Sequence, residues 1–145
     1  MIKIRIFIQN YLFYLKFHHV KLLVVDDNPI NQKLLLYSLK KEFDIELANN
    51  GLEAVNILAD NSFDVVLMDL MMPVMDGAEA TLRIRESDRH RNKYIPIILL
   101  TTNDLENDRL RCMESGADDY LIKPVNITNL IDTIDYHIKQ KQEMY

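Results

Sequence analysis

The chain has 145 residues, of which 48% are hydrophobic and 27% charged, a balance typical of one soluble domain with its own core. Its net charge of −5 argues against direct nucleic-acid binding. Its single cysteine, Cys112, excludes an internal disulfide and favours a reducing compartment, so we expect a cytoplasmic protein.

Residues 1–19 form an apolar, basic extension that differs from the rest of the chain. Three basic residues and no acid give the first 20 residues a charge of +3, so the remaining 125 carry −8. The longest uncharged run, Ile6–Leu15, has 10 residues, half of the roughly 20 that a membrane-spanning helix needs. Two interpretations stay open: a segment that lies on a membrane or docks on a partner, or a simple extension packed loosely on the domain. Membrane contact is expected only through these residues.

From residue 20 onward, short apolar runs alternate with segments at helical spacing. The runs are rich in β-branched and large apolar residues and several are apolar throughout, which predicts strands buried on both faces. Five such strands are predicted, at 21–25, 45–48, 65–68, 96–100 and 120–122. Their alternation with helices predicts an α/β fold, a doubly wound parallel sheet with helices on both faces.

Helix starts are marked by capping residues. Asn28 stands before Pro29, which suits the first turn of a helix because its missing N–H costs nothing there. Asn50, Asp76 and Asn103 are each followed three residues later by glutamate, the spacing of a capping box. The last predicted helix carries one apolar face, made of Ile127, Leu130, Ile131, Ile134 and Ile138.

Polar side chains follow the predicted strands where each strand ends. Asp26 and Asp27 follow the first strand, Asp69 the third, Thr101 the fourth and Lys123 the fifth. Because parallel strands end at one edge of a sheet, and ligands bind there in folds of this class, we expect these side chains to converge. Taken alone, each residue also fits a turn, a strand end or a solvated surface.

Three carboxylates in one place repel one another, and a divalent cation removes that conflict. Ligation by oxygen alone from few protein groups favours Mg²⁺, which keeps open positions for phosphate. A lysine and a hydroxyl can hold phosphoryl oxygens, and a carboxylate such as Asp69 can itself accept a phosphoryl group.

The sequence resembles the receiver domain of two-component response regulators over about residues 20–140, with 141–145 as a tail. The resemblance rests on Val24–Asn28, Met68–Gly77, Pro96–Thr101 and Gly116–Pro124. Asn28–Gln32 and Met72–Gly77 look most like receivers of hybrid sensor kinases. The resemblance implies a flavodoxin-like sheet with strand order 2-1-3-4-5.

The resemblance also implies a role for each matching residue. Asp69 corresponds to the phosphoacceptor and Lys123 to the cation that pairs with the phosphoryl group. Asp26, Asp27 and Asp69 correspond to the Mg²⁺ ligands, joined by the backbone carbonyl of Met71.

Two further positions match the conformational switch of the family, Thr101 and Tyr120, and the Lys123–Pro124 peptide bond is expected to be cis. Tyr120 also fits a half-buried strand aromatic.

The implied function is that of a phosphoacceptor and switch rather than a turnover enzyme. The phosphoryl donor would be a phosphohistidine on a sensor histidine kinase or a histidine phosphotransfer protein. A downstream protein would read the surface of the fourth helix of the domain, before Gly116, and the fifth strand.

Three departures and two rival functions accompany this interpretation. Thr102 stands where the family usually has a smaller residue, Met71 and Asn103 flank the site, and the family does not account for residues 1–19. One rival is an interaction module that works without phosphorylation. The other is a Mg²⁺-dependent phosphohydrolase, which would want an acid two residues after Asp69, where Met71 stands.

Overall fold

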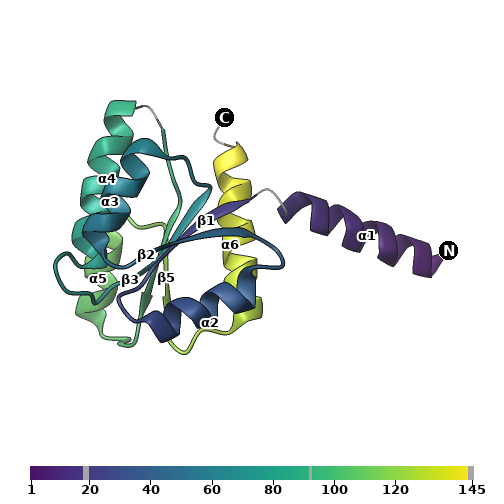
Figure 1. The fold of residues 1–145 in the computed structure, drawn as a ribbon, viewed down its shortest axis with the longest axis horizontal. Coiled ribbons are helices and arrows are strands. Elements are labelled where there is room, and N and C mark those ends of the chain that lie inside the picture. The colour runs from purple at the N-terminus through teal and green to yellow at the C-terminus, as the bar shows by residue number, and fades with distance from the viewer. Residues whose placement is uncertain (18–19, 92, 144–145) are drawn as a thin grey trace.

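A five-stranded parallel sheet with the order β2-β1-β3-β4-β5 lies at the centre of the computed structural model (Figure 1). This order confirms the predicted architecture. The structure describes residues 1–17, 20–91 and 93–143. The elements in chain order are α1 (Ile2–Phe17), β1 (Lys21–Val25), α2 (Pro29–Leu39), β2 (Asp44–Ala48), α3 (Gly51–Asp60), β3 (Val65–Asp69), α4 (Gly77–Arg91), β4 (Ile97–Thr101), α5 (Glu106–Glu114), β5 (Asp119–Ile122) and α6 (Ile127–Glu143).

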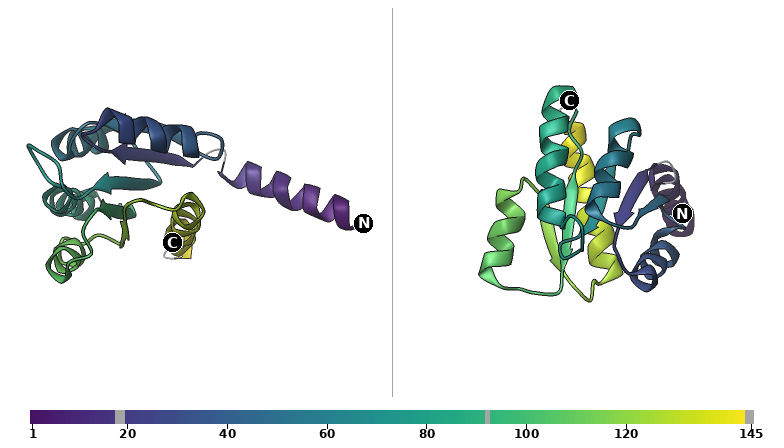
Figure 2. Two further views of the ribbon diagram at one scale, coloured as in Figure 1. Left: turned by 90° about the horizontal axis from the view of Figure 1, so that it is seen from below. Right: turned by 60° about the vertical axis from the view of Figure 1, so that its left-hand side comes forward.

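Helices cover both faces of the sheet, so the core has two layers (Figure 2). On one face, alternate strand residues pack against α2 and α6, through side chains such as Leu35 and Leu130. On the other face they pack against α3, α4 and α5, through Ala54, Ile84 and the buried Cys112. The central strands β1, β3 and β4 are almost wholly buried, as continuous apolar runs predict.

Three of the four predicted helix caps are confirmed by hydrogen bonds. The side-chain oxygens of Asn28, Asn50 and Asp76 accept backbone N–H groups in the first turns of α2, α3 and α4, at 2.8–2.9 Å for the shortest bond of each. The fourth prediction, Asn103, is wrong: α5 begins at Glu106, and its N-cap residue is Leu105, which makes no side-chain cap bond. The N–H of Asn103 instead donates to Thr101 Oγ1 at 3.2 Å, which ties this residue to the end of β4.

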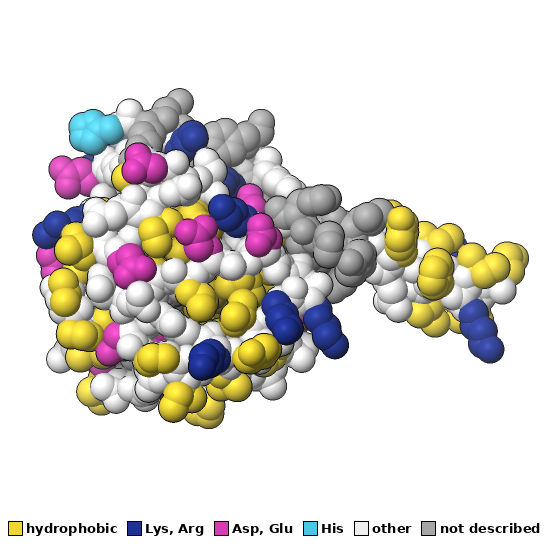
Figure 3. All heavy atoms as spheres, viewed as in Figure 1, with side chains coloured by type: hydrophobic (Ala, Val, Ile, Leu, Met, Phe, Trp, Pro, Cys, Tyr) yellow, Lys and Arg dark blue, Asp and Glu magenta, His cyan; other side chains and the backbone are white. Residues whose placement is uncertain are grey.

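Helix α1 projects from the domain at the N-terminal end of β1 (Figure 1). All of residues 1–12 are exposed, including seven large apolar side chains from Ile2 to Leu12, and hydrophobic side chains stand on the coloured part of this helix in Figure 3. Within the described part of the chain, none of the helices combines the length and hydropathy that crossing a membrane demands. At the other end, α6 continues to Glu143, so residues 141–143 of the predicted tail are helical, while 144–145 lie outside the described residues.

A buried arginine joins α4 to the starts of two strands. Arg85 is 9% exposed, and its guanidinium makes ion pairs with Asp118 at 2.7 Å and Asp88 at 3.1 Å. It also donates to the carbonyl oxygens of Ile95, at 2.6 Å, and Gly116, at 2.8 Å. Because these groups precede β4 and β5, Arg85 fixes the edge of the sheet opposite the predicted site.

We expect Arg85→Lys to lower the free energy of unfolding by about 2–3 kcal/mol, because one ammonium cannot satisfy acceptors arranged around a planar guanidinium. Arg83→Lys, on the exposed side of the same helix, is the matched control and should cost less than about 0.5 kcal/mol. Urea unfolding measures both values. Equal losses in the two variants would contradict the assigned role of Arg85.

A second pair gives the fold a predictable acid sensitivity. The His137 Nε2 atom of α6 lies 2.9 Å from Asp119 Oδ2 of β5, and this hydrogen bond outweighs burial to hold the pKa of the Asp119 carboxyl below its usual value. The folded state therefore binds this proton more weakly than the unfolded chain does. The pair stabilises the fold above the ordinary pKa, and that stability is lost as the pH falls through the lowered pKa.

We expect His137→Phe to remove about 0.5–1 kcal/mol of the stability that the wild type loses on acidification from about pH 5 to pH 3. The effect is small because Asp119 is 39% exposed and solvent screens the interaction. Urea unfolding at several pH values measures it. An unchanged acid dependence in the variant would contradict this assignment.

Candidate functional site

Three carboxylates meet at the carboxyl edge of the sheet. Asp26 directly follows β1 and is 1% exposed, Asp69 is the last residue of β3 and is 8% exposed, and Asp27 is open to solvent. One ligand oxygen from each lies within 4.8 Å of the others. Parallel pairing of β1 with β3, with Val25 opposite Met68, places the two strand ends side by side.

The ammonium group of Lys123 lies between the two buried carboxylates. Its Nζ atom is 3.2 Å from Asp26 Oδ2 and 3.3 Å from Asp69 Oδ2. Lys123 follows β5, and its backbone N–H donates to the carbonyl of Thr101 at 2.7 Å, so the lysine is anchored to the end of β4. The peptide bond between Lys123 and Pro124 is cis.

The Asp69 carboxyl has a raised pKa. Burial is the main cause and the charge of Asp26 adds to it, while Lys123 and a hydrogen bond with the Met71 backbone act in the opposite direction. The ammonium group of Lys123 therefore does not fully offset the burial of these carboxylates and the repulsion between them. A bound cation would lower this cost. Three hard carboxylate oxygens are a donor set that fits Mg²⁺.

The loop after Asp69 is held by a close backbone approach. Gly77, the first residue of α4, donates its N–H to the Leu70 carbonyl at 2.8 Å. A β-carbon at position 77 would lie 2.5 Å from the backbone oxygen of Asp69, so only glycine fits there. Strand β3 and the loop that carries Met71 are thereby fixed to each other.

The two predicted switch residues lie on neighbouring strands. Thr101 is buried at the end of β4, and its hydroxyl oxygen accepts from the N–H of Asn103 at 3.2 Å. Tyr120 of β5 is half-buried, and its hydroxyl contacts Arg109 of α5, whose guanidinium also lies over the tyrosine ring. Arg109 forms a further ion pair with Asp104 at 3.3 Å.

The structure thus brings together Asp26, Asp27, Asp69 and Lys123, and it places Met71, which is 56% exposed, on the rim. The flanking residues Thr102 and Asn103 are exposed. The sequence alone assigned no role to two further residues, which contact Tyr120 and the backbone of Asp26.

These missed residues are Arg109, which contacts Tyr120, and Gln32, whose side-chain amide bonds the backbone of Asp26. Gln32 belongs to the motif Asn28–Gln32, on which the family resemblance partly rests, but no spacing rule predicts the hydrogen-bond acceptors of its amide. Arg109 gives no sequence signal at all.

Fold and site together define an α/β domain with a cluster of three carboxylates and a lysine at the carboxyl edge of a parallel sheet. Residues 22–135 match the family model described as the response regulator receiver domain. The chain belongs to the response regulator receiver domain family.

Relatives and solved structures agree with this assignment. The chain is 39% identical over 124 residues to hybrid signal transduction histidine kinase I of Dictyostelium discoideum, covering 81% of this chain and 7% of that protein. It is 41% identical over 114 residues to sensor histidine kinase RcsC of Salmonella typhi, covering 78% of this chain and 12% of that protein. The chain thus spans about a tenth of the length of these relatives.

Two solved receiver domains have similar folds. The receiver domain of sensor histidine kinase PA1611 from Pseudomonas aeruginosa, with magnesium in its active-site cleft, matches with a TM-score of 0.76 and 35% identity, over 83% of this chain and 98% of that one. The receiver domain of Ssk1 from Saccharomyces cerevisiae, solved with the histidine phosphotransfer protein Ypd1, matches with a TM-score of 0.79 and 34% identity, over 86% and 93% of the two chains.

We expect Mg²⁺ to raise the melting temperature of the wild type, because a bound ion stabilises only the folded state, and we expect Asp27→Asn to abolish that rise. Without Mg²⁺ the variant should be as stable as the wild type or more stable by up to about 1 kcal/mol, since one repulsive charge is removed. Asp60→Asn, on the exposed end of α3, is the control. Thermal melts across a Mg²⁺ series test this, and an undiminished Mg²⁺ effect in Asp27→Asn would contradict the assignment.

Proposed function

We propose that Asp69 accepts a phosphoryl group from a phosphohistidine on a sensor histidine kinase or a histidine phosphotransfer protein, and that the aspartyl phosphate changes a partner-binding surface. The observation that carries this proposal is the position of Asp69. It ends a buried strand 3.3 Å from the Lys123 ammonium and forms a cluster with two further carboxylates.

In the proposed transfer, an oxygen of the Asp69 carboxylate attacks phosphorus while the phosphorus–nitrogen bond of the donor breaks. The leaving imidazole keeps the bonding electron pair and is neutral, because its other ring nitrogen carries a proton. Lys123 moves from its contacts with Asp26 and Asp69 onto a phosphoryl oxygen, where a point charge offsets the arriving negative charge.

Asp26, Asp27, Asp69 and the Met71 carbonyl would hold Mg²⁺ at this site. When bound, the ion neutralises the charge of the carboxylates and of the phosphoryl oxygens. The buried Asp26 carboxylate is oriented for this task, because its Oδ1 atom accepts the N–H of Asn28 at 2.8 Å.

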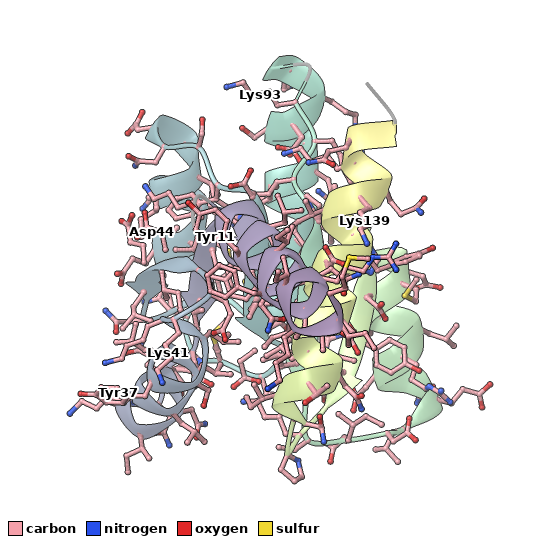
Figure 4. All side chains as sticks on the ribbon, turned by 90° about the vertical axis from the view of Figure 1, so that its right-hand side faces the viewer. Tyr11, Tyr37, Lys41, Asp44, Lys93 and Lys139 are labelled. Carbon is pink, nitrogen blue, oxygen red and sulfur yellow. The ribbon has the colours of Figure 1, made fainter. Side chains whose placement is uncertain are left out.

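The rim of the site has the character of a protein-docking surface. On α2, Ile30, Leu34 and Tyr37 follow one another at helical spacing and are 65–75% exposed, and Val74 in the loop after Asp69 is 78% exposed. Tyr37 points outward from α2 in Figure 4. A solvent-exposed apolar stripe next to an acceptor favours a protein donor over a small molecule. The complex of the Ssk1 receiver with Ypd1 supports a histidine phosphotransfer protein as that donor.

Phosphorylation would be read at the face formed by α5 and β5. The Thr101 hydroxyl turns from Asn103 toward the phosphoryl group, and Tyr120 follows into the space that it leaves. This motion breaks the contact of Tyr120 with Arg109, so α5 loses one of its links to β5. A downstream protein would then bind the altered face.

Exposure to acetyl phosphate and Mg²⁺ tests the acceptor. We expect the wild type to gain the mass of one phosphoryl group and Asp69→Asn to gain none, because an amide cannot form the acyl phosphate. Asp132→Asn, an exposed acid of α6, should be labelled as the wild type is. Equal labelling of Asp69→Asn and wild type would reject Asp69 as the acceptor.

Met71 provides a prediction about the lifetime of the phosphorylated form. Its exposed side chain offers a hydrolytic water no hydrogen bond, so we expect slow loss of phosphate. Met71→Asn should hydrolyse several-fold faster, measured by intact mass after removal of the phosphodonor. Val74→Asn places the same amide elsewhere on the rim, in a backbone conformation with φ of 71° that asparagine tolerates, and should leave the rate unchanged. Equal rates in Met71→Asn and wild type would contradict the explanation.

A further inference from the structure

A buried glutamine of α2 bonds the main chain that carries the acid pair. Gln32 is 8% exposed, and its Nε2 atom lies 2.7 Å from the carbonyl oxygen of Asp26 and 3.0 Å from that of Ala48. A third oxygen, Asn49 Oδ1, is also 3.0 Å away. The side-chain NH₂ group therefore faces three oxygen acceptors, and only a hydrogen-bond donor suits this position.

The place of these acceptors explains why a side chain is needed. The pairing of β1 with β2 ends at Val25 and Ala48, and the pairing of β1 with β3 ends at Val25 and Met68. The carbonyl of Asp26 lies one residue beyond both ladders. A buried carbonyl left without a donor costs about 1–3 kcal/mol, and Gln32 supplies the donor from the first turns of α2.

The amide of Gln32 is itself held in place from β2 and α3. Asn49 directs its own NH₂ group to the carboxylate of Glu53, at 3.1 and 3.4 Å, which leaves its oxygen facing Gln32. The connection thus runs from the first turn of α3 through two amides to the backbone of Asp26.

We infer that Gln32 is a positioning residue for the cation-binding acids Asp26 and Asp27. This inference rests on the proposed function, and it assigns to Gln32 the role of orienting the cation-binding acids without being a ligand itself. The backbone N–H of Asp26 donates to the Ala48 carbonyl at 3.2 Å, and its carboxylate is held by Asn28 at 2.8 Å and by Lys123 at 3.2 Å. Its carbonyl is held by Gln32 at 2.7 Å. With the carbonyl released, the turn after β1 can rotate and both carboxylates lose their common orientation.

The direct test is Mg²⁺ binding measured by isothermal titration calorimetry on the whole chain. Gln32→Met keeps the length of the side chain and removes the donor, and we expect its Mg²⁺ affinity to fall by about 10–100-fold, the range for residues that orient metal ligands. Gln32→Asn keeps the amide but shortens its reach by one methylene group, and it should shift the affinity in the same direction.

Two controls separate positioning from loss of stability. Gln140→Met makes the same substitution at an exposed position of α6 and should bind Mg²⁺ as the wild type does. Arg85→Lys weakens the fold from the opposite edge of the sheet and should leave the Mg²⁺ affinity within about threefold, because Arg85 does not contact the acid pair. In phosphorylation by acetyl phosphate, the half-saturating Mg²⁺ concentration of Gln32→Met should rise while the rate at saturating Mg²⁺ is largely kept.

The outcomes are distinguishable. Wild-type affinity in both Gln32 variants, or an equal loss of affinity in Arg85→Lys, would overturn the role of Gln32 and leave the proposed function intact. A wild-type chain that binds no Mg²⁺ would overturn both.

Discussion

One ammonium group, that of Lys123, lies between two buried carboxylates whose charges would otherwise oppose folding. Asp26 and Asp69 are brought to it by strands that are paired in parallel and covered on both faces, so neither acid can withdraw into solvent. A single cation leaves this cluster short of positive charge. The pKa of Asp69 is raised mainly by burial and further by the charge of Asp26, although Lys123 acts in the opposite direction. The remaining imbalance is the physical basis for expecting a divalent ion and a transferred phosphoryl group at this place.

Other contacts in the structure fix the positions of these charged side chains. Gly77 fixes β3 to the loop that follows it, and Gln32 fixes the end of β1 to the end of β2. At the opposite edge, Arg85 secures the starts of β4 and β5, whose ends carry Thr101 and Lys123. Rigid anchoring at one edge of the sheet and polar side chains at the other is an arrangement suited to a site whose groups must be held in place.

Sequence periodicity predicted the five strands, because a central strand that is buried on both faces consists of consecutive apolar residues. The alternation of these strands with helices predicted their parallel arrangement, and with it the convergence of the site residues. Capping chemistry also predicted three helix starts, since Asn28, Asn50 and Asp76 act on residues close to them in the chain. The cap at Asn103 failed because α5 begins only at Glu106, three residues further on, with Leu105 as its N-cap. The contacts of Gln32 and Arg109 could not be predicted, since they depend on which side chains the folded loops bring within reach.

The central claim is that the phosphoryl group resides on Asp69 and on no other acid of the carboxylate cluster. Borohydride reduces an acyl phosphate to an alcohol, so an aspartyl phosphate becomes homoserine, and peptide mapping by mass spectrometry then locates it. After treatment with phosphodonor and Mg²⁺, the account predicts homoserine at position 69 alone. Homoserine at position 26 or 27, or a phosphorylated chain that yields none at position 69, would contradict it.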